Sequence, residues 1–159
     1  MMNLAAHMPA GATAPELAVC MADTLLHLPS RAAAAALCTR VHSALAPGGA
    51  FILTFRDMST ALRGLDRFIS VRSDDSTVFT CFLEYDDVSG ETVTVHAIVH
   101  RRAAPAAPGW VMHESCFQKL RLSSAWVVQA LRDAGFCEVT TGSGAGGFVV
   151  VTARGAGAG

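Results

Sequence analysis

The chain has 159 residues, 52% of them hydrophobic, and a formal net charge of −1. This length suffices for one hydrophobic core, and the near-zero charge gives no electrostatic reason to expect binding to nucleic acid or to a membrane surface. No apolar segment approaches the ~20 residues that span a bilayer, and no basic region followed by an apolar stretch suggests a signal peptide. The five cysteines are odd in number and widely spaced, which is typical of free thiols in a reducing cytosol, so a cytoplasmic location is expected.

The opening of the chain predicts a parallel strand–helix–strand unit. Residues 1–15 show no convincing period and are expected to form a loose lead-in. The apolar run Leu17–Met21 predicts a buried strand, and Ser30 is placed to cap a helix over Arg31–Leu45. The Pro47-Gly48-Gly49 sequence ends that helix, and Ala50–Phe55 is a second apolar strand.

The middle of the chain predicts an antiparallel insert at about residues 66–121. From residue 92 onward, valines and an alanine alternate with polar residues, and this period of two is typical of a strand with one buried face. Residues 86–90 are expected to form a hairpin loop, and residues 103–109, with two prolines, a second loop. The expected strands are Phe68–Arg72, Thr77–Tyr85, Thr92–Arg101 and Trp110–Arg121.

The last part of the chain predicts a helix and two closing strands. Ser123 or Ser124 is placed to cap a helix that runs to Ala134, and Gly135 is a good stop signal. The strands are expected at Cys137–Thr141 and Phe148–Ala153, followed by a disordered tail over residues 154–159. The predicted fold class is therefore α/β, with a partial Rossmann-like sheet and an antiparallel β insert.

The segment Gly142–Gly147 matches the G-x-G-x-x-G pattern of nucleotide-binding loops. That pattern binds phosphate only between a strand and a helix, where the helix N-terminus faces the ligand. Here a strand-like run of valines follows, so we interpret the segment as a hairpin turn.

Three segments in this order resemble the carboxyl-terminal half of class I S-adenosylmethionine-dependent methyltransferases. Val19–Leu28 is similar to the family's fourth strand and the loop after it, Leu45–Phe51 to the approach to the fifth strand, and Leu131–Phe136 to the approach to the sixth. The resemblance covers about residues 15–153. The segments Thr54–Asp57, Cys81–Tyr85 and Phe117–Arg121 are similar to a small-molecule branch near the glycine N-methyltransferase-like enzymes.

The resemblance implies a cofactor site of which only a part is present. The family binds S-adenosylmethionine largely through a glycine-rich loop after its first strand and an acidic residue after its second, and neither has a counterpart in this sequence. A glycine is usual where Ala22 stands. We therefore expect a chain that begins near the family's third strand or later, with an incomplete site and doubtful activity in isolation.

The resemblance assigns roles to the residues that follow the first predicted strand. Cys20, Met21, Ala22 and His27 would contact the cofactor, Asp23 would be the polar catalytic contact, and Thr24 would face the substrate. Polar residues at the carboxyl end of a parallel strand are where ligands bind in such sheets. The alternative is that Asp23 and Thr24 satisfy backbone amides of the loop.

Further substrate contacts are expected from the second strand and from the insert. Arg56 could clamp a substrate carboxylate through its planar fork, with Asp57 beside it. Alternatively, Asp57 or Ser59 could cap a short helix, with Arg56 in a surface pair. Tyr85, Lys119 and Arg121 could line a substrate lid, or they could be the solvated polar positions of a half-exposed sheet.

No metal site and no nucleophilic triad is expected. On a strand, the four residues from His96 to His100 span roughly 13 Å, which is too far for two ligands of one ion. The sequence has no G-x-S-x-G elbow.

Two functions remain open at this point. One is methyl transfer from S-adenosylmethionine to a small-molecule acceptor by a methyltransferase of which this chain is a part. The other is a non-catalytic pairing module, in which the edge of Leu17–Met21 is completed by a separate amino-terminal half or by self-association.

Overall fold

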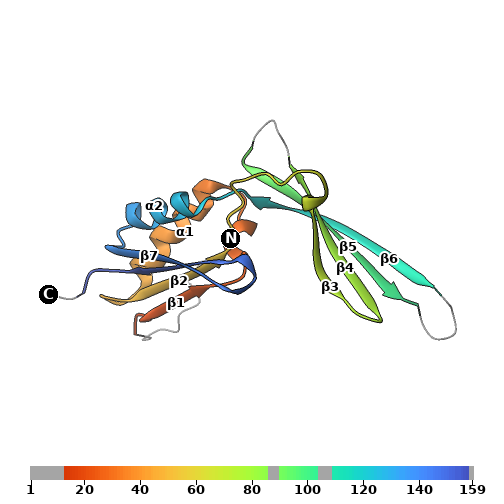
Figure 1. Ribbon diagram of the computed structural model, residues 1–159. Coiled ribbons are helices and arrows are strands. Elements are labelled where there is room, and N and C mark those ends of the chain that lie inside the picture. Colours follow the sequence, from red (N-terminus) through yellow and green to blue (C-terminus); the bar gives the residue numbers. More distant parts are fainter. Residues whose placement is uncertain (1–12, 86–89, 104–108, 158–159) are drawn as a thin grey trace. The chain divides into compact units, whose positions relative to one another are not determined.

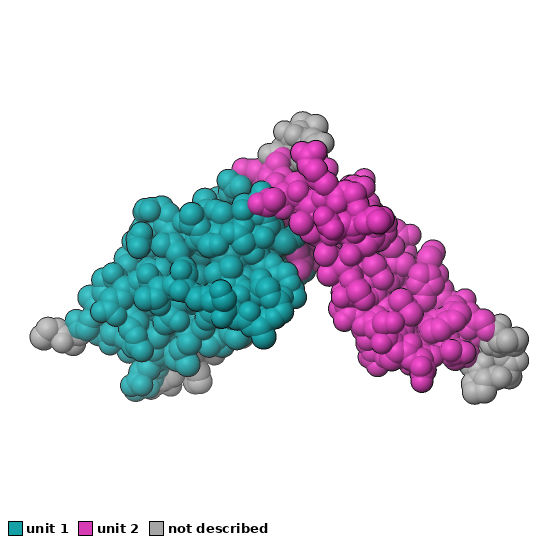
Figure 2. All heavy atoms as spheres, in the orientation of Figure 1, with its two compact units in different colours: residues 1–59, 122–159 teal, residues 60–121 magenta. Residues whose placement is uncertain are grey.

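A computed structural model describes residues 13–85, 90–103 and 109–157. The predicted hairpin loop at 86–90 and the proline-containing loop at 103–109 lie largely outside the described residues, as does most of the predicted lead-in. The chain divides into two compact units, drawn in teal and magenta in Figure 2. Unit 1 comprises Met1–Ser59 and Leu122–Gly159, and unit 2 comprises Thr60–Arg121.

Unit 1 contains a four-stranded sheet in the order β1-β2-β8-β7. Strands β1 (Leu17–Cys20) and β2 (Ala50–Phe55) are parallel, and β8 (Val149–Arg154) runs antiparallel to β2 and to β7 (Glu138–Ser143). Helices α1 (Arg31–Ala44) and α2 (Ser124–Asp133) cover the same face of this sheet (Figure 1). The predicted strand–helix–strand opening and the α/β fold class are confirmed.

The ends of both helices follow local sequence signals. The Ser30 hydroxyl accepts a hydrogen bond from the backbone N–H of Ala33 at 3.1 Å, and the Ser123 hydroxyl accepts one from Trp126 at 3.1 Å. Of the two predicted caps for α2, Ser123 is therefore the one that is used. Gly135 follows α2 with a φ of +106°, a conformation that glycine adopts at little cost.

The core of unit 1 lies between the sheet and the two helices. Phe51, Leu53 and Phe55 alternate along β2 and are fully buried, as are Val127 and Leu131 on α2. This alternation places one face of β2 against the helices, because successive side chains of a strand point to opposite faces. Burial of large apolar side chains such as these is the main source of folding free energy.

Strand β1 is the outer strand of the sheet, and it pairs with β2 alone among the described strands. Leu17 and Val19 are 54% and 58% exposed. The strand stops at Cys20, one residue earlier than predicted, because Ala22 and Asp23 adopt left-handed backbone conformations that end the pairing.

The glycine-rich segment forms a hairpin turn, as predicted. It joins β7 to β8 through a short 3₁₀ turn at Ala145–Gly147, and the N–H of Gly144 donates to the carbonyl of Phe148 at 2.7 Å. No helix follows it.

The end of the chain differs from the predicted disordered tail. Strand β8 includes Arg154, and the next residues bond to the turn before β2: Gly155 donates to the carbonyl of Gly49 at 3.0 Å, and Ala156 accepts from Gly48 at 2.7 Å. The low-complexity sequence does not predict these contacts, because they are made by backbone groups and depend on no particular side chain. Residues 158–159 lie outside the described residues.

Unit 2 is the predicted antiparallel insert. Strands β3 (Phe68–Ser73), β4 (Thr77–Tyr85), β5 (Thr92–Arg102) and β6 (Trp110–Leu120) pair in chain order, preceded by a 3₁₀ turn, η3 (Gly64–Arg67). Val93, Val95 and Ala97 are buried on one face of β5, as their alternation predicts. The unit begins at Thr60, before the predicted start near residue 66, because it includes η3 and the residues ahead of it.

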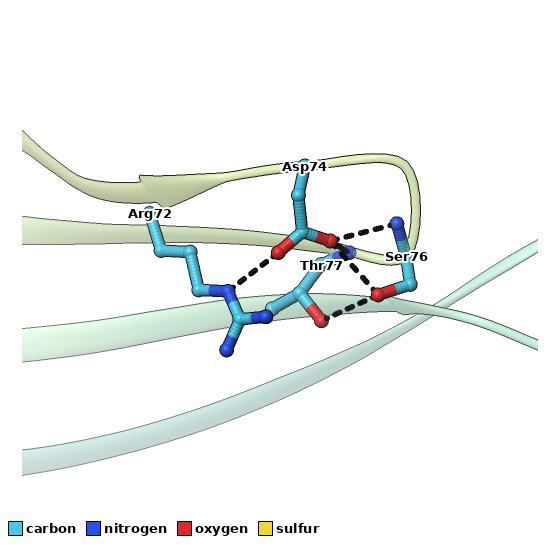
Figure 3. A network of polar contacts seen from close by, with 4 residues as sticks. All are labelled: Arg72, Asp74, Ser76 and Thr77. Carbon is cyan, nitrogen blue, oxygen red and sulfur yellow. Dashed lines mark hydrogen bonds and ion pairs between the residues drawn. The ribbon is translucent and has the colours of Figure 1, made fainter.

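The turn between β3 and β4 is organised by one carboxylate (Figure 3). Asp74 accepts hydrogen bonds from the backbone N–H groups of Ser76 and Thr77, each at 2.9 Å, and its other oxygen pairs with Arg72. The hydrogen bonds from Ser76 are the main reason that the pKa of Asp74 lies below its ordinary value. An aspartate that bonds to the next backbone amides is a common turn device.

Candidate functional site

The turn after β1 is held in an unusual conformation by the end of β2. Ala22 and Asp23 have φ values of 53° and 62°, which non-glycine residues adopt uncommonly and often at functional sites. The N–H of Ala22 donates to the hydroxyl of Thr54 at 2.6 Å, and the N–H of Asp23 donates to the Thr54 carbonyl at 3.1 Å. Thr54 thus fixes this turn, a role that the sequence analysis missed because the two residues are far apart in the chain.

The Asp23 carboxylate is buried, with 4% of the residue exposed, and it is paired. One oxygen accepts from the backbone N–H of Arg56 at 2.7 Å, and the other accepts from the Arg56 guanidinium at 2.9 Å. Removal of a carboxylate from water is costly unless such partners compensate it. The predicted catalytic residue and the predicted substrate clamp therefore lie together and bind each other.

Arg56 also packs on an aromatic ring. Its guanidinium carbon lies 4.0 Å from the centre of the Phe148 ring at the start of β8, a favourable cation–π arrangement. The Arg56 side chain remains 46% exposed. One guanidinium nitrogen of Arg56 donates to Asp23. The other guanidinium nitrogens have no hydrogen bond to a described residue, so their N–H groups are available to a ligand.

The remaining residues of this turn make contacts with their near neighbours in the sequence. The hydroxyl of Thr24 donates to the Met21 carbonyl at 2.6 Å. A 3₁₀ turn over Thr24–His27 comes next, anchored by the buried Leu25, and His27 is exposed at its end. Met21 and Ala22 are exposed beside the strand end, although the Met21 carbonyl and the Ala22 N–H are already bonded to Thr24 and Thr54.

Asp57 lies at the start of α2 instead of capping a helix of its own segment. Its carboxylate accepts from the backbone N–H of Ser124 at 2.8 Å and from the Ser124 hydroxyl, and its other oxygen accepts from Ser59. Partial burial pushes the pKa of Asp57 upward, but the hydrogen bonds from Ser124 and Ser59 outweigh it and hold the pKa at about 2. A negative charge at a helix N-terminus is stabilising, so this carboxylate has a structural task.

An apolar hollow of about 500 Å³ lies beside β1 and α1. Cys20 and Thr24 line it together with apolar residues of β1, α1 and β2, among them Ala18, Leu37 and Phe51. Burial raises the pKa of the Cys20 thiol, and burial with the nearby Cys20 raises the pKa of Cys38 to about 11. All five cysteines are free, as predicted.

In unit 2, the structure brings the predicted lid residues together. Tyr85 and Lys119 both pair in register with Val93, from β4 and β6, so they lie on the same face of the sheet. The guanidinium carbon of Arg121 lies 5.1 Å from the centre of the Tyr85 ring. Tyr85 also lines a pocket of about 310 Å³ with Arg63 and Arg67, two residues that the sequence analysis did not single out.

The described residues contain no group of three side chains suited to hold a metal ion. His96 instead bonds to Glu84, with 2.8 Å between Nε2 and Oε2, and lies 3.5 Å from Glu114. The hydrogen bond to Glu84 is the main reason that the pKa of His96 is raised. Within the same described ranges, no helix is long and apolar enough to cross a membrane.

Comparisons with known proteins give matches by structure and none by sequence. No protein-family model and no curated protein matches the sequence. The CcbJ methyltransferase from Streptomyces caelestis superposes with a TM-score of 0.70 at 17% identity, over 89% of this chain and 61% of that one. An S-adenosylmethionine-dependent methyltransferase from Clostridium acetobutylicum gives a TM-score of 0.69 at 12% identity, over 89% and 58%.

A third match is an amino pentose methyltransferase from Micromonospora echinaspora, CalS10, whose structure holds bound S-adenosylmethionine. It gives a TM-score of 0.66 at 17% identity, over 87% of this chain and 57% of that one. This chain thus spans about three fifths of the length of these methyltransferases. At such identities the likeness shows the fold alone, and over the part that it spans the chain has the fold of class I S-adenosylmethionine-dependent methyltransferases.

Proposed function

We propose that this chain is the carboxyl-terminal, acceptor-binding part of an S-adenosylmethionine-dependent methyltransferase that acts on a small molecule, near the glycine N-methyltransferase-like branch. The main supporting observation is the left-handed turn at Ala22 and Asp23, held by Thr54 and Arg56 at the carboxyl ends of two parallel strands. In doubly wound sheets, ligands bind at that edge. Free cysteines are consistent with a cytosolic protein, which we include in the proposal.

The residues present fit one wall of a cofactor site. Met21 and Ala22 are exposed at the strand end, next to Cys20 and near the exposed His27 in sequence, and these are the residues that would hold the methionine end. No glycine-rich turn lies between a strand and a helix in the part of the chain that the structure describes. We therefore propose that the loop and the acidic residue for the rest of the cofactor come from a segment outside this sequence.

When bound, the cofactor supplies a methyl group on a positively charged sulfur, and the acceptor's lone pair forms the new bond to carbon while the carbon–sulfur electrons return to sulfur. The chain's residues would orient the acceptor and exclude water, which lowers the barrier by fixing the reacting geometry. Arg56 is half-exposed, and it would bind an acceptor carboxylate. Thr24, next to Asp23 in the sequence, and Asp57, next to Arg56, would be further acceptor contacts. Asp23 would hold Arg56 in place and would be the polar catalytic contact to the acceptor.

An activity experiment tests this proposal. The DNA upstream of Met1 is translated in frame, and a protein extended by the strand, glycine-rich loop and helix expected there is assayed for methyl transfer to small amines with and without a carboxylate. The substitution R56Q should raise KM for carboxylate-bearing acceptors about tenfold, because a charge-assisted hydrogen bond is lost, and should change kcat little. The matched control is R154Q, which removes the charge of an exposed arginine on β8. An extended protein without methyl transfer, or with equal effects of the two substitutions, contradicts the proposal.

A pairing module is the second candidate, and a separate observation favours it. Leu17 and Val19 on β1 are 54% and 58% exposed, Met21 just after it is 48% exposed, and the apolar hollow lies beside the same strand. An unpaired strand edge with apolar side chains is a template for another strand. Light scattering over a range of concentrations tests self-association: dimers that V19K abolishes would support it, and a folded, strictly monomeric protein would rule it out.

A further inference from the structure

We propose that unit 2 carries a binding site for the anionic group of a small molecule, a carboxylate or a phosphate, in the pocket lined by Arg63, Arg67 and Tyr85. The pocket has a volume of about 310 Å³, enough for a small organic anion, and residues 61–64 are among those that line it. All of its lining residues belong to unit 2. This proposal goes beyond methyl transfer and does not depend on it.

The two arginines of the pocket have no acidic partner among the residues that the structure describes. Among the described residues, the Arg63 side chain makes no ion pair and no hydrogen bond, and it is exposed. Arg67 donates only a long hydrogen bond, 3.4 Å, to the Gly64 carbonyl, and its guanidinium carbon lies 4.7 Å from the centre of the Phe82 ring. The ring contact holds Arg67 in position and leaves its other donors available.

Tyr85 adds a neutral donor to the pocket. Its hydroxyl has no hydrogen bond to a described residue, while Arg121 packs over its ring at 5.1 Å. This contact orients the ring and brings a further positive charge to it. Two planar guanidinium groups and a phenol are the donor set that recognises carboxylate and phosphate oxygens.

A solvated basic surface is the alternative, because lone arginines on exposed sheets usually have no ligand. Here the residues come from two places in the chain, the N-cap and last residue of η3 and the end of β4, and they surround one hollow. Asp86 and Asp87 follow Tyr85 in the sequence and lie outside the described residues, so the test uses the full chain, in which they are present as competitors.

The test is a titration followed by NMR of the arginine Nε–Hε groups, without S-adenosylmethionine. Inorganic phosphate, succinate and uncharged glycerol are added in turn at constant ionic strength, because salt screens exposed charges. We expect saturable shifts of the Arg63 and Arg67 signals with at least one anion and none with glycerol. The anion that binds more tightly distinguishes phosphate from carboxylate recognition.

Substitutions then separate a site from a charged surface. R63Q and R67Q should each weaken binding about tenfold, the effect of losing a hydrogen bond to a charged group. R101Q is the matched control, because Arg101 is exposed in the same unit and does not line the pocket. Shifts that do not saturate with either anion, or an equal loss in R101Q, would overturn the proposal. Since no cofactor is present, the result is independent of whether methyl transfer occurs.

Discussion

At the scale of single residues, the Asp23–Arg56 pair is the feature on which the candidate site depends. Arg56 contacts the Asp23 carboxylate through both its backbone and its side chain, and the ring of Phe148, the residue before β8, packs against the guanidinium. The two partners differ in exposure: the Arg56 side chain is 46% exposed, whereas Asp23 is buried. Solvent screens the ionic part of such a pair, but the buried carboxylate still needs its donors.

Substitution D23A should lower the free energy of unfolding by about 1–3 kcal/mol, because the N–H of Arg56 and its guanidinium lose a charged acceptor. Urea unfolding followed by circular dichroism measures this change. E138Q, at an exposed glutamate of β7, is the control and should be near neutral. Equal midpoints for D23A and E138Q would mean that the pair does not hold the turn.

A second residue-scale prediction concerns Asp57 and acid. Its pKa in the folded protein is about 2, below the ordinary 3.8, so the folded state binds fewer protons and gains stability above that range. This contribution should be complete above about pH 4 and should disappear as the pH falls toward 2. The difference in melting temperature between wild type and D57N should therefore shrink between pH 5 and pH 2.5. A difference that stays constant with pH would show that the Ser124 contact is not charge-dependent.

At the scale of elements, the sequence predicts strands and helices well because their signals are local. Serine caps, the period of two in β5 and the glycine after α2 depend on neighbouring residues, and the corresponding elements begin or end within about two residues of the prediction. The functional contacts are long-range. Thr54 bonds to Ala22, 32 residues away in the sequence, and Asp57 bonds to Ser124, 67 residues away. The periodicity of a single segment does not predict contacts between residues so far apart.

The glycine after α2 gives an element-scale prediction. A Cβ on Gly135 would lie 2.8 Å from the His42 ring, and its φ of +106° disfavours other residues. G135A should therefore lower the free energy of unfolding by about 1 kcal/mol or more. G142A is the matched control, because Gly142 has open space around its Cβ position and no positive φ. Similar stabilities of the two variants, measured by urea unfolding, would contradict the proposed packing of α2 against α1.

At the scale of the whole molecule, the sheet order β1-β2-β8-β7 is more informative than any single residue. The sequence predicted the α/β fold class and the order of elements along the chain, through a resemblance in the order of three segments, but not the order of strands within the sheet. Solved methyltransferases share the fold at 12–17% identity. The sequence also placed Tyr85 and Arg121 on the insert. It did not predict the pocket that Tyr85 forms with Arg63 and Arg67, because that pocket depends on how η3 folds back on β4.

Calorimetric titration with S-adenosylmethionine tests the central claim most directly. The chain of residues 1–159 is titrated alone, and again in a protein extended at its amino terminus by a strand, glycine-rich loop and helix of the kind that the proposal requires. Our account predicts micromolar binding by the extended protein and no measurable binding by the chain alone, because Cys20–Ala22 form only one wall of the site. Micromolar binding by the chain alone, or no binding by the extended protein, would contradict it.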